Sequence, residues 1–329
     1  MFDIDFVIPW VNGADIEWQK QFNSYLPVGK SGIDIGTNRY RDNGLLRYWF
    51  RGIETFAPWV RKIHFITMGH KPEWLNINNP KLHFVKHTDY IPSEYLPTFN
   101  SNVIELMIHK IPDLAEHFVH FNDDVFLINP VYPDDYFTSD GTVKDSAVFR
   151  SIPISEYGHI LLSNEIMVNK CINRKSLFKQ NKAKWFSLKY KKRVLQNWYF
   201  SKRIEDAYLE CRHFAKPYTK AAFSDGWEIC KNELFNTMKN RYRTGNDLSI
   251  CFFRILNLYR GNFEPINDEN SRMLTDIDKN IERICGAVRG RNIKELVIND
   301  SICDDYDLRL QQLKNAFEQK FPNKSSFEL

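Results

Sequence analysis

Long apolar stretches and a secretory leader are both missing from this chain. Its 329 residues contain no run near the roughly 20 apolar residues that a membrane-spanning helix needs. The first five residues lack the basic and apolar regions of a signal peptide. Cysteine is also sparse, with six residues, all in the second half and none in a paired metal-binding spacing. We therefore expect a cytoplasmic protein with reduced cysteines, in preference to a disulfide framework.

Internal repeats and low-complexity tracts are absent as well. The composition is 43% hydrophobic and 15% aromatic, which is enough for a large core. The net charge of +4 is small and no nucleic-acid-binding module is recognisable, so we expect no nucleic-acid partner. We predict an α/β portion over residues 1–150, a mainly helical, basic and aromatic insertion over 151–235, and a portion over 236–329 that completes the first domain.

Hydrophobic patterns in the first 130 residues alternate between the periods of strands and helices. The expected strands cover residues 4–11, 62–68, 82–85 and the start of the stretch 118–127. The expected helices run from Asp42 or Asn43 to Ala57 and from about residue 101 to Pro112, with Asn102 and Glu105 at capping-box spacing. This order predicts an α/β fold with a mostly parallel sheet flanked by helices.

The stretch F-V-H-F-N-D-D-V-F-L, residues 118–127, carries the strongest chemical signal. An apolar strand runs directly into Asn122, Asp123 and Asp124. Two adjacent carboxylates at the end of a buried strand repel each other and lose hydration, so a cation commonly holds such a pair together. Residues of this kind also favour a plain turn through local hydrogen bonds. The pattern alone leaves both interpretations open.

A second loop belongs to the same edge of the expected sheet. Asn12 and Gly13 follow the first strand, as Asn122 and the two acids follow a later one. Ligands of open α/β sheets bind beyond the carboxyl ends of the parallel strands. We therefore expect the two loops to share one face.

Three long segments resemble a known family. They read I-D-F-V-I-P-W-V-N-G-A-D over residues 4–15, L-R-Y-W-F-R-G-I-E-T-F-A-P-W-V-R-K-I over 46–63, and P-T-F-N-S-N-V-I-E through I-P-D-L-A-E-H-F-V-H-F-N-D-D-V-F over 97–126. These segments resemble the first two conserved regions of the Stealth phosphotransferases. That family includes bacterial capsular and exopolysaccharide sugar-phosphate transferases and the animal GlcNAc-1-phosphotransferase α/β subunit.

The resemblance implies both an activity and a fold. The activity is transfer of sugar 1-phosphate from a nucleotide diphosphate sugar, in the first place a UDP-sugar, to a hydroxyl of a glycan. The implied fold is GT-A-like (Rossmann-like), with a helical insertion or subdomain in the second half, and residues 1–150 would bind the nucleotide sugar.

The C-terminal half resembles the family more loosely. His213 stands in H-F-A-K-P, Arg243 follows thirty residues later in R-T-G-N-D, and a short apolar strand ends in Asn299 and Asp300. Pro9 departs from the family pattern, in which Thr is usual at this position.

Catalytic and metal-binding roles follow from the resemblance and from the needs of phosphoryl transfer. Mg²⁺ or Mn²⁺ at Asp123 and Asp124 would neutralise a diphosphate, because both are hard cations that prefer oxygen ligands. Asn299 and Asp300 would complete the metal or acceptor site, or form a turn. His213, with an ordinary pKa of about 6.5, would be the base for the acceptor hydroxyl, although a single histidine beside aromatic residues is more often structural.

Arg243 and Asp5 are the other catalytic candidates. Arg243 would hold a phosphate through its planar donors, with Arg241 as the alternative and a solvated helix face as the structural explanation. Asp5 is a carboxylate inside an apolar strand, which is costly if it is buried unpaired. It either lies at a wet strand end or contacts the metal, the base or the nucleotide, and the resemblance favours the second.

The candidates for binding the nucleotide sugar are Trp10, Asn12, Gly13, Arg47 and Asn122. A nucleobase near Trp10 would suit this set, although a tryptophan here is more often a core or wall residue. Arg47, near a helix start, either pairs with a local acid or points at the diphosphate.

Residues 179–203 mix lysine and arginine with tryptophan, tyrosine and phenylalanine. A helical segment of this kind can lie on an anionic membrane, which would suit a lipid-linked acceptor at the inner face of the membrane. It can equally cover the sheet while its lysines stay solvated.

Three functional classes remain open from the sequence. The leading one is a sugar-phosphate transferase that forms a phosphodiester in capsular or cell-surface polysaccharide. The alternative is a metal-dependent glycosyltransferase that uses the same kind of donor but forms a glycosidic bond. The third is a carbohydrate-binding protein without catalytic activity.

Overall fold

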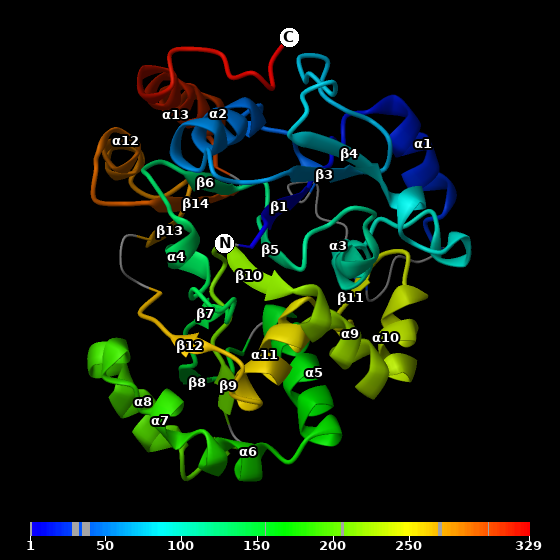
Figure 1. Ribbon diagram of the computed structural model, residues 1–329. Helices are drawn as coiled ribbons and strands as arrows, with labels where there is room; N and C mark the ends of the chain where they lie inside the picture. The colour runs from blue at the N-terminus through cyan, green and yellow to red at the C-terminus, as the bar shows by residue number, and fades with distance from the viewer. Residues whose placement is uncertain are drawn as a thin grey trace.

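A central sheet with helices on both of its faces forms the middle of the molecule (Figure 1). The computed structural model describes residues 2–27, 33–34, 40–154, 156–204, 207–268, 272–301 and 303–329.

Within the described residues the central sheet has five strands in the order β10-β5-β1-β3-β4. Their bounds are β1 Ile4–Pro9, β3 Ile63–Thr67, β4 Leu82–Lys86, β5 His117–His120 and β10 Lys216–Thr219. β1, β3, β4 and β5 run parallel, and β10 pairs with β5 in the antiparallel sense. β1 and β3 are buried almost throughout, as expected for parallel strands covered on both faces. The predicted α/β fold with a mostly parallel sheet is confirmed.

The two helices predicted in the first half are both present. α2 spans Leu46–Phe56, and its apolar positions, recurring at helical spacing, are buried against the sheets. α3 spans Ser101–Leu106 and continues into a 3₁₀ turn. The capping prediction for Asn102 and Glu105 was wrong, because the side chain of Asn100 accepts the hydrogen bond from the N–H of Asn102 and is itself the N-cap.

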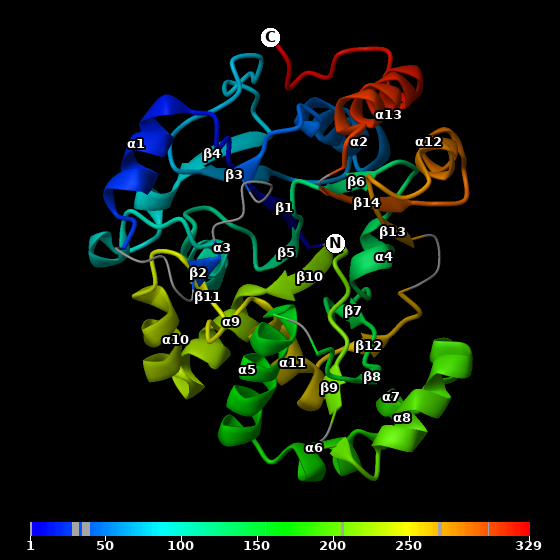
Figure 2. The same ribbon diagram turned by 180° about the vertical axis from the view of Figure 1, so that it is seen from behind.

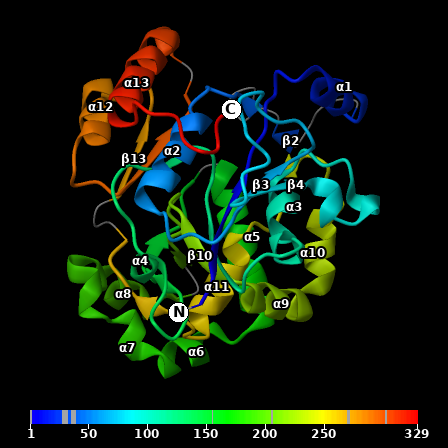
Figure 3. The ribbon, with the colours of Figure 1, turned by 45° about the horizontal axis from the view of Figure 1, so that its top comes forward.

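A second sheet has three strands, and the chain enters it at β6, directly after the turn that follows β5. Its order is β13-β14-β6, with β6 Val125–Leu127, β13 Arg272–Asp276 and β14 Glu295–Asn299. α12 (Ile281–Arg289) and α13 (Tyr306–Lys320) pack against each other beside it, and α1 (Ile16–Ser24) lies at the opposite end of the molecule (Figure 3). Strand β14, from the last part of the chain, therefore pairs with β6 next to the carboxyl end of β5.

The stretch 156–259 is mainly helical, and its helices lie on the side of the central sheet away from α12 and α13 (Figure 2). Its helices are α5 Glu156–Cys171, α6 Arg174–Gln180, α7 Lys182–Trp185, α8 Val194–Phe200, α9 Lys220–Ile229, α10 Lys231–Met238 and α11 Cys251–Tyr259. Among the described residues no helix has the length and apolar character to cross a bilayer.

Short elements connect these layers. They are the helix α4 Pro133–Tyr136 and the strands β2 Ile33–Asp34, β7 Lys144–Asp145, β8 Phe149–Ser151, β9 Ala207–Leu209, β11 Arg243–Thr244 and β12 Glu264–Pro265. The region 151–235 thus contributes β10 to the central sheet in addition to its helices.

Candidate active site

The acids predicted to bind a metal lie in a tight turn between β5 and β6. The N–H of Val125 donates to the carbonyl of Asn122 at 3.1 Å, which closes the turn. The N–H of Ile298, on β14, donates to the carbonyl of Asp124 at 3.0 Å. Both sheets therefore fix the backbone that carries Asn122, Asp123 and Asp124. The turn and the strand-end acid pair, which were alternatives in the sequence, are one feature of the structure.

His213 reaches this turn from the segment between β9 and β10. Its Nε2 lies 2.9 Å from Oδ1 and 3.0 Å from Oδ2 of Asp124, and the side-chain amide of Asn122 lies 3.1 Å away. Burial lowers the pKa of His213, but the surrounding carboxylates, led by Asp124, raise it above its ordinary value. The His213 side chain is 40% exposed. A substrate hydroxyl can therefore approach the imidazole.

Asp123 is half-buried beside a second carboxylate. Burial, followed by the charges of Asp124 and Asp42, raises the pKa of Asp123 to about 7. A bound cation would favour the charged carboxylate at this position. Among the described residues, no three His, Cys, Asp or Glu side chains are already arranged around one metal position. Mg²⁺ is commonly bound by one or two carboxylates together with substrate phosphates and water. The donor set fits a cation of that kind.

Glu105 and Arg243 complete the cluster around His213. Burial raises the pKa of Glu105 to about 7, and the charges of Arg243 and then His213 act in the opposite direction. The guanidinium of Arg243 donates to the hydroxyl of Ser101 at the start of α3. From the sequence, Glu105 was predicted only as part of a helix cap, and its place beside His213 was not foreseen. An acid on a short apolar helix that precedes the Asn-Asp-Asp strand was the available signal.

A buried network around Asp247 holds Arg243 in place. Oδ2 of Asp247 accepts a hydrogen bond from the side chain of Asn100 at 2.7 Å. Because Asn100 also caps α3, this network joins the helix to the loop that carries Arg243. The guanidinium of Arg241 instead donates to a backbone carbonyl at 2.6 Å. Of the two arginines, Arg243 is therefore the one that belongs to the cluster.

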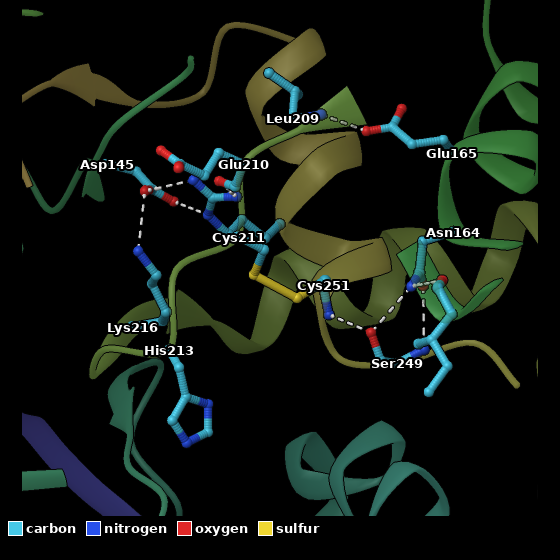
Figure 4. Close-up of a disulfide and its surroundings, with 12 residues drawn as sticks. Asp145, Asn164, Glu165, Leu209, Glu210, Cys211, His213, Lys216, Ser249 and Cys251 are labelled. Carbon is cyan, nitrogen blue, oxygen red and sulfur yellow. Dashed lines mark hydrogen bonds and ion pairs between the residues drawn. A yellow bond between two sulfur atoms is a disulfide. The ribbon is translucent and has the colours of Figure 1, made fainter. Parts of the chain in front are cut away.

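A disulfide anchors the segment that carries His213. Cys211, two residues earlier, is bonded to Cys251 at the start of α11, with 6.8 Å between their Cα atoms (Figure 4). α5 holds both neighbourhoods, because Glu165 accepts from the backbone of β9 and Asn164 from the turn before α11. The expectation of reduced cysteines was wrong for this pair. Their separation of 40 residues forms no motif that could reveal the pairing.

The loop after β1 carries three of the residues predicted to bind the nucleotide sugar. The N–H of Asn12 donates to Nε2 of His70 at 3.0 Å. The N–H of Gly13 donates to the carbonyl of Tyr40 at 2.6 Å, and a Cβ at Gly13 would stand 2.6 Å from the same oxygen, so a side chain does not fit. Trp10 is 6% exposed, which makes it a wall of the core.

Arg47 lies in the first turn of α2. Its guanidinium stands over the ring of Trp74, 5.5 Å from the centroid. The structure thus gives Arg47 an aromatic partner, and its contact with a diphosphate stays a prediction.

Asn299 and Asp300 lie at the end of β14 with partners of their own. The side-chain amide of Asn299 donates to Asp276 at 2.9 Å. The carboxylate of Asp300 lies 3.0 Å from Nε of Arg41. They therefore flank the acid pair, and the structure does not join them with Asp123 and Asp124 into one set of metal ligands.

Asp5 lies at the other end of the strand from this cluster. It is fully buried, and its carboxylate accepts hydrogen bonds from both Nε and Nη2 of Arg61, at 2.9 and 2.6 Å. His64 Nε2 lies 2.9 Å away, and the N–H of Ala115 donates at 2.8 Å. Asp5 pairs in register with Phe118, four residues before the turn, or about 13 Å along the strand. The structure therefore does not bring Asp5 to the site and gives it a structural ion pair.

Replacing Asp5 with Asn should lower the free energy of unfolding by about 1–3 kcal/mol, because it removes a fully buried carboxylate that accepts hydrogen bonds from Arg61 and from the N–H of Ala115. Burial alone would raise the pKa of Asp5, but the hydrogen bonds that it accepts hold that pKa below its usual value. The stabilisation is therefore present above the unfolded-chain pKa of about 3.9 and is lost as the pH falls through the lower folded-state pKa. Denaturant unfolding at several pH values measures it.

Asp3→Asn is the matched control, because Asp3 is 73% exposed and lies 3.9 Å from the same guanidinium. Its effect should stay within about 1 kcal/mol. Equal losses for the two variants would contradict the assignment of Asp5 as the structural partner.

The fold and this cluster together define a class of protein. A mostly parallel α/β sheet presents two acids, a histidine and an arginine beyond its carboxyl edge, which is the arrangement of an enzyme that transfers a charged group. Comparisons with known proteins agree. Residues 2–27 match the model for "Stealth protein CR1, conserved region 1", and residues 39–145 match that for "Stealth protein CR2, conserved region 2".

Relatives match over the full length of the chain. A capsular polysaccharide phosphotransferase of Streptococcus pneumoniae is 38% identical, with 100% of this chain and 98% of the relative aligned. An exopolysaccharide phosphotransferase of Lactiplantibacillus plantarum is 32% identical over 99% and 96%. A receptor polysaccharide phosphotransferase of Streptococcus gordonii is 33% identical over 99% of both. The chain belongs to the Stealth family of phosphotransferases, so the resemblance seen in its sequence is confirmed.

Proposed function

We propose that this enzyme transfers sugar 1-phosphate from a nucleotide diphosphate sugar, in the first place a UDP-sugar, to a hydroxyl of a glycan acceptor. The product is a phosphodiester in a capsular or cell-surface polysaccharide. The observation that carries the proposal is the pairing of His213 with Asp124 of the acid pair at one edge of the sheet, with Glu105 and Arg243 close enough to act on one another electrostatically beside it. The names of the full-length relatives support phosphotransfer to a polysaccharide.

Each side chain has a task in this reaction. The acceptor oxygen attacks the β-phosphorus, the bond to the nucleoside monophosphate breaks, and the hydroxyl proton passes to Nδ1 of His213, because Nε2 donates to Asp124. Asp124 orients the imidazole and stabilises it once it is protonated. Arg243 holds a phosphate oxygen with its planar donors. When bound, Mg²⁺ or Mn²⁺ would lie against Asp123 and Asp124 and neutralise charge on the diphosphate.

Product analysis tests the proposal. The protein is incubated with a panel of UDP-sugars, Mg²⁺ or Mn²⁺ and oligosaccharide acceptors, and the products are examined by phosphorus NMR. A phosphodiester with release of nucleoside monophosphate is the expected result. A glycoside with release of nucleoside diphosphate would identify the alternative glycosyltransferase, and absence of turnover with every donor would favour a carbohydrate-binding protein.

The basic and aromatic segment supports a peripheral contact with an anionic membrane, which we include in the proposal. Residues 174–204 contain eleven Lys and Arg and no Asp or Glu. In the structure, Leu188 is 88% exposed and Trp198 62% exposed, and exposed cations lie in the 3₁₀ turn 188–193 and directly after α8, at Lys202 and Arg203. Apolar side chains beside exposed cations are suited to the headgroup region of an anionic bilayer. A lipid-linked acceptor would be presented there.

Removing three exposed cations from this surface should weaken binding to anionic vesicles by about a hundred-fold, since each contributes about 1 kcal/mol near the surface. The variant combines Lys192→Ser, Lys202→Ser and Arg203→Ser, and vesicle sedimentation measures it. The matched control makes the same change at three lysines that are exposed elsewhere, Lys86, Lys110 and Lys324. Equal binding of both variants and wild type to anionic and neutral vesicles would remove the membrane contact from the proposal.

A further inference from the structure

A cavity of about 540 Å³ lies apart from the catalytic cluster, at the opposite end of β14. Its walls come from α4, from the 3₁₀ turn 188–193 and from the first residues of β13 and β14. This volume falls in the range of pockets that hold small ligands. The side chains in it that matter for a ligand are Arg272, Tyr136 and Lys191.

Arg272 lines this cavity with most of its donors unused. Its side chain is 12% exposed, and its partners among the described residues are Glu295, with 3.4 Å between Nε and Oε2, and the ring of Phe214, 5.5 Å from the guanidinium. A guanidinium has five N–H donors in a planar fork that matches phosphate and carboxylate oxygens. A buried arginine with unused donors on a cavity wall is suited to an anion.

Tyr136 supplies an independent indication. Its side chain is 1% exposed, and its hydroxyl has no hydrogen-bond partner within the part of the chain that the structure describes. Buried hydroxyls are normally paired, and Tyr136 lines the cavity. A ligand oxygen in the cavity would give this hydroxyl the partner that the protein does not.

Lys191 adds a cation to the rim. Its φ of +50° places a residue other than glycine in the left-handed region, which costs free energy and is concentrated at functional sites. The rim acids Asp134 and Asp135 already pair with Lys144 and Lys294, respectively. The positive charge of Lys191 therefore stays available to a ligand.

The cavity adjoins the segment between β9 and β10 that carries His213. Glu295, on the cavity wall, accepts from the N–H of Ala215 at 2.7 Å, and Arg272 lies over Phe214. Phe214 and Ala215 directly follow His213 in the chain. The cavity and the catalytic cluster thus lie on opposite sides of one short segment.

We propose that this cavity binds a phosphate ester carried by the acceptor, separately from the donor diphosphate. Arg272 and Lys191 hold the phosphate oxygens and Tyr136 donates to the ester or to a sugar oxygen. The proposal rests on the proposed function, in which an acceptor could carry phosphate as a phosphodiester within the glycan or in a lipid diphosphate. Both sources share the chemistry that the cavity recognises.

Tyr136→Phe and Lys191→Gly test the cavity without a folding penalty. The first removes a hydroxyl that has no protein partner, and the second places glycine where φ is positive. The probes are an oligosaccharide with one internal phosphodiester, the same oligosaccharide without phosphate, and a short-chain lipid diphosphate sugar. Calorimetry should show that each variant binds one phosphorylated probe about ten-fold more weakly, relative to the neutral probe.

Lys170→Gly is the matched control, because it removes the same charge from an exposed position near the end of α5, outside the cavity. The phosphorylated probe that loses affinity identifies the source of the phosphate. Unchanged binding of both phosphorylated probes, as in the control, would overturn the proposal even if turnover confirmed the transferase. Weakened binding without turnover by the wild type would instead keep the cavity and reject the proposed reaction.

Discussion

Replacing Asp123 with Ala should lower turnover on the order of a thousand-fold, a loss of several kcal/mol of transition-state stabilisation. Asp123 and Asp124 are the two carboxylates that the turn between β5 and β6 presents beyond the sheet. A divalent cation held by these two carboxylates would neutralise charge on the diphosphate. Steady-state rates with a UDP-sugar and an acceptor, over a range of Mn²⁺ concentrations, measure the effect.

The fold should survive this change. Asp123 is half-buried, its carboxylate is bonded only to its own backbone among the described residues, and its removal relieves repulsion with Asp124. We expect thermal unfolding of Asp123→Ala at or above the wild-type temperature. Asp225→Ala is the control, because it removes an exposed acid on α9, and its rate should equal that of the wild type. A wild-type rate for Asp123→Ala would show that the acid pair has been assigned wrongly.

The fold of the first half could be predicted because its elements have strong periodic patterns. The strand predicted over residues 4–11 spans Ile4–Pro9, and the one predicted over 62–68 spans Ile63–Thr67. Both are buried on two faces and so appear as continuous apolar runs. β10 reads K-P-Y-T and has no such run, and its place beside β5 depends on contacts far away in sequence. The antiparallel edge of the sheet was therefore not predictable from pattern.

The site shows the same limit at the level of single side chains. His213 and Asp124 were identified separately, by motif, and the structure brings them together. Asp5 and Glu105 could not be assigned by pattern, because an acid among apolar residues has one appearance whether its partner is a structural arginine or a substrate. Only the tertiary structure distinguishes the two acids. Asp5 accepts hydrogen bonds from Arg61 at the far end of β1, whereas Glu105 lies near His213 and Arg243.

His213→Gln should lower kcat by about 10²–10⁴-fold with little change in the KM for the donor. His213 is placed to take the acceptor proton on Nδ1, because Asp124 holds its Nε2 at 2.9 Å while the side chain remains 40% exposed. Glutamine keeps a polar group near Asp124 but cannot accept a proton at neutral pH. Because the donor is held by other groups, the loss should appear in the rate of the chemical step, which single-turnover kinetics measure.

His159→Gln separates this role from a general effect of losing a histidine. His159 is exposed on α5 beside Gly245, and within the described residues it forms no hydrogen bond or ion pair with the cluster, so its variant should turn over at the wild-type rate. If His213 were a structural residue, its replacement would lower the unfolding temperature and leave the rate per folded molecule unchanged. A slow enzyme with a wild-type unfolding temperature instead requires that His213 act on the acceptor hydroxyl. Such a role would give the Cys211–Cys251 bond, two residues away, a function. It would hold the imidazole beside the acceptor hydroxyl while that oxygen attacks the phosphorus.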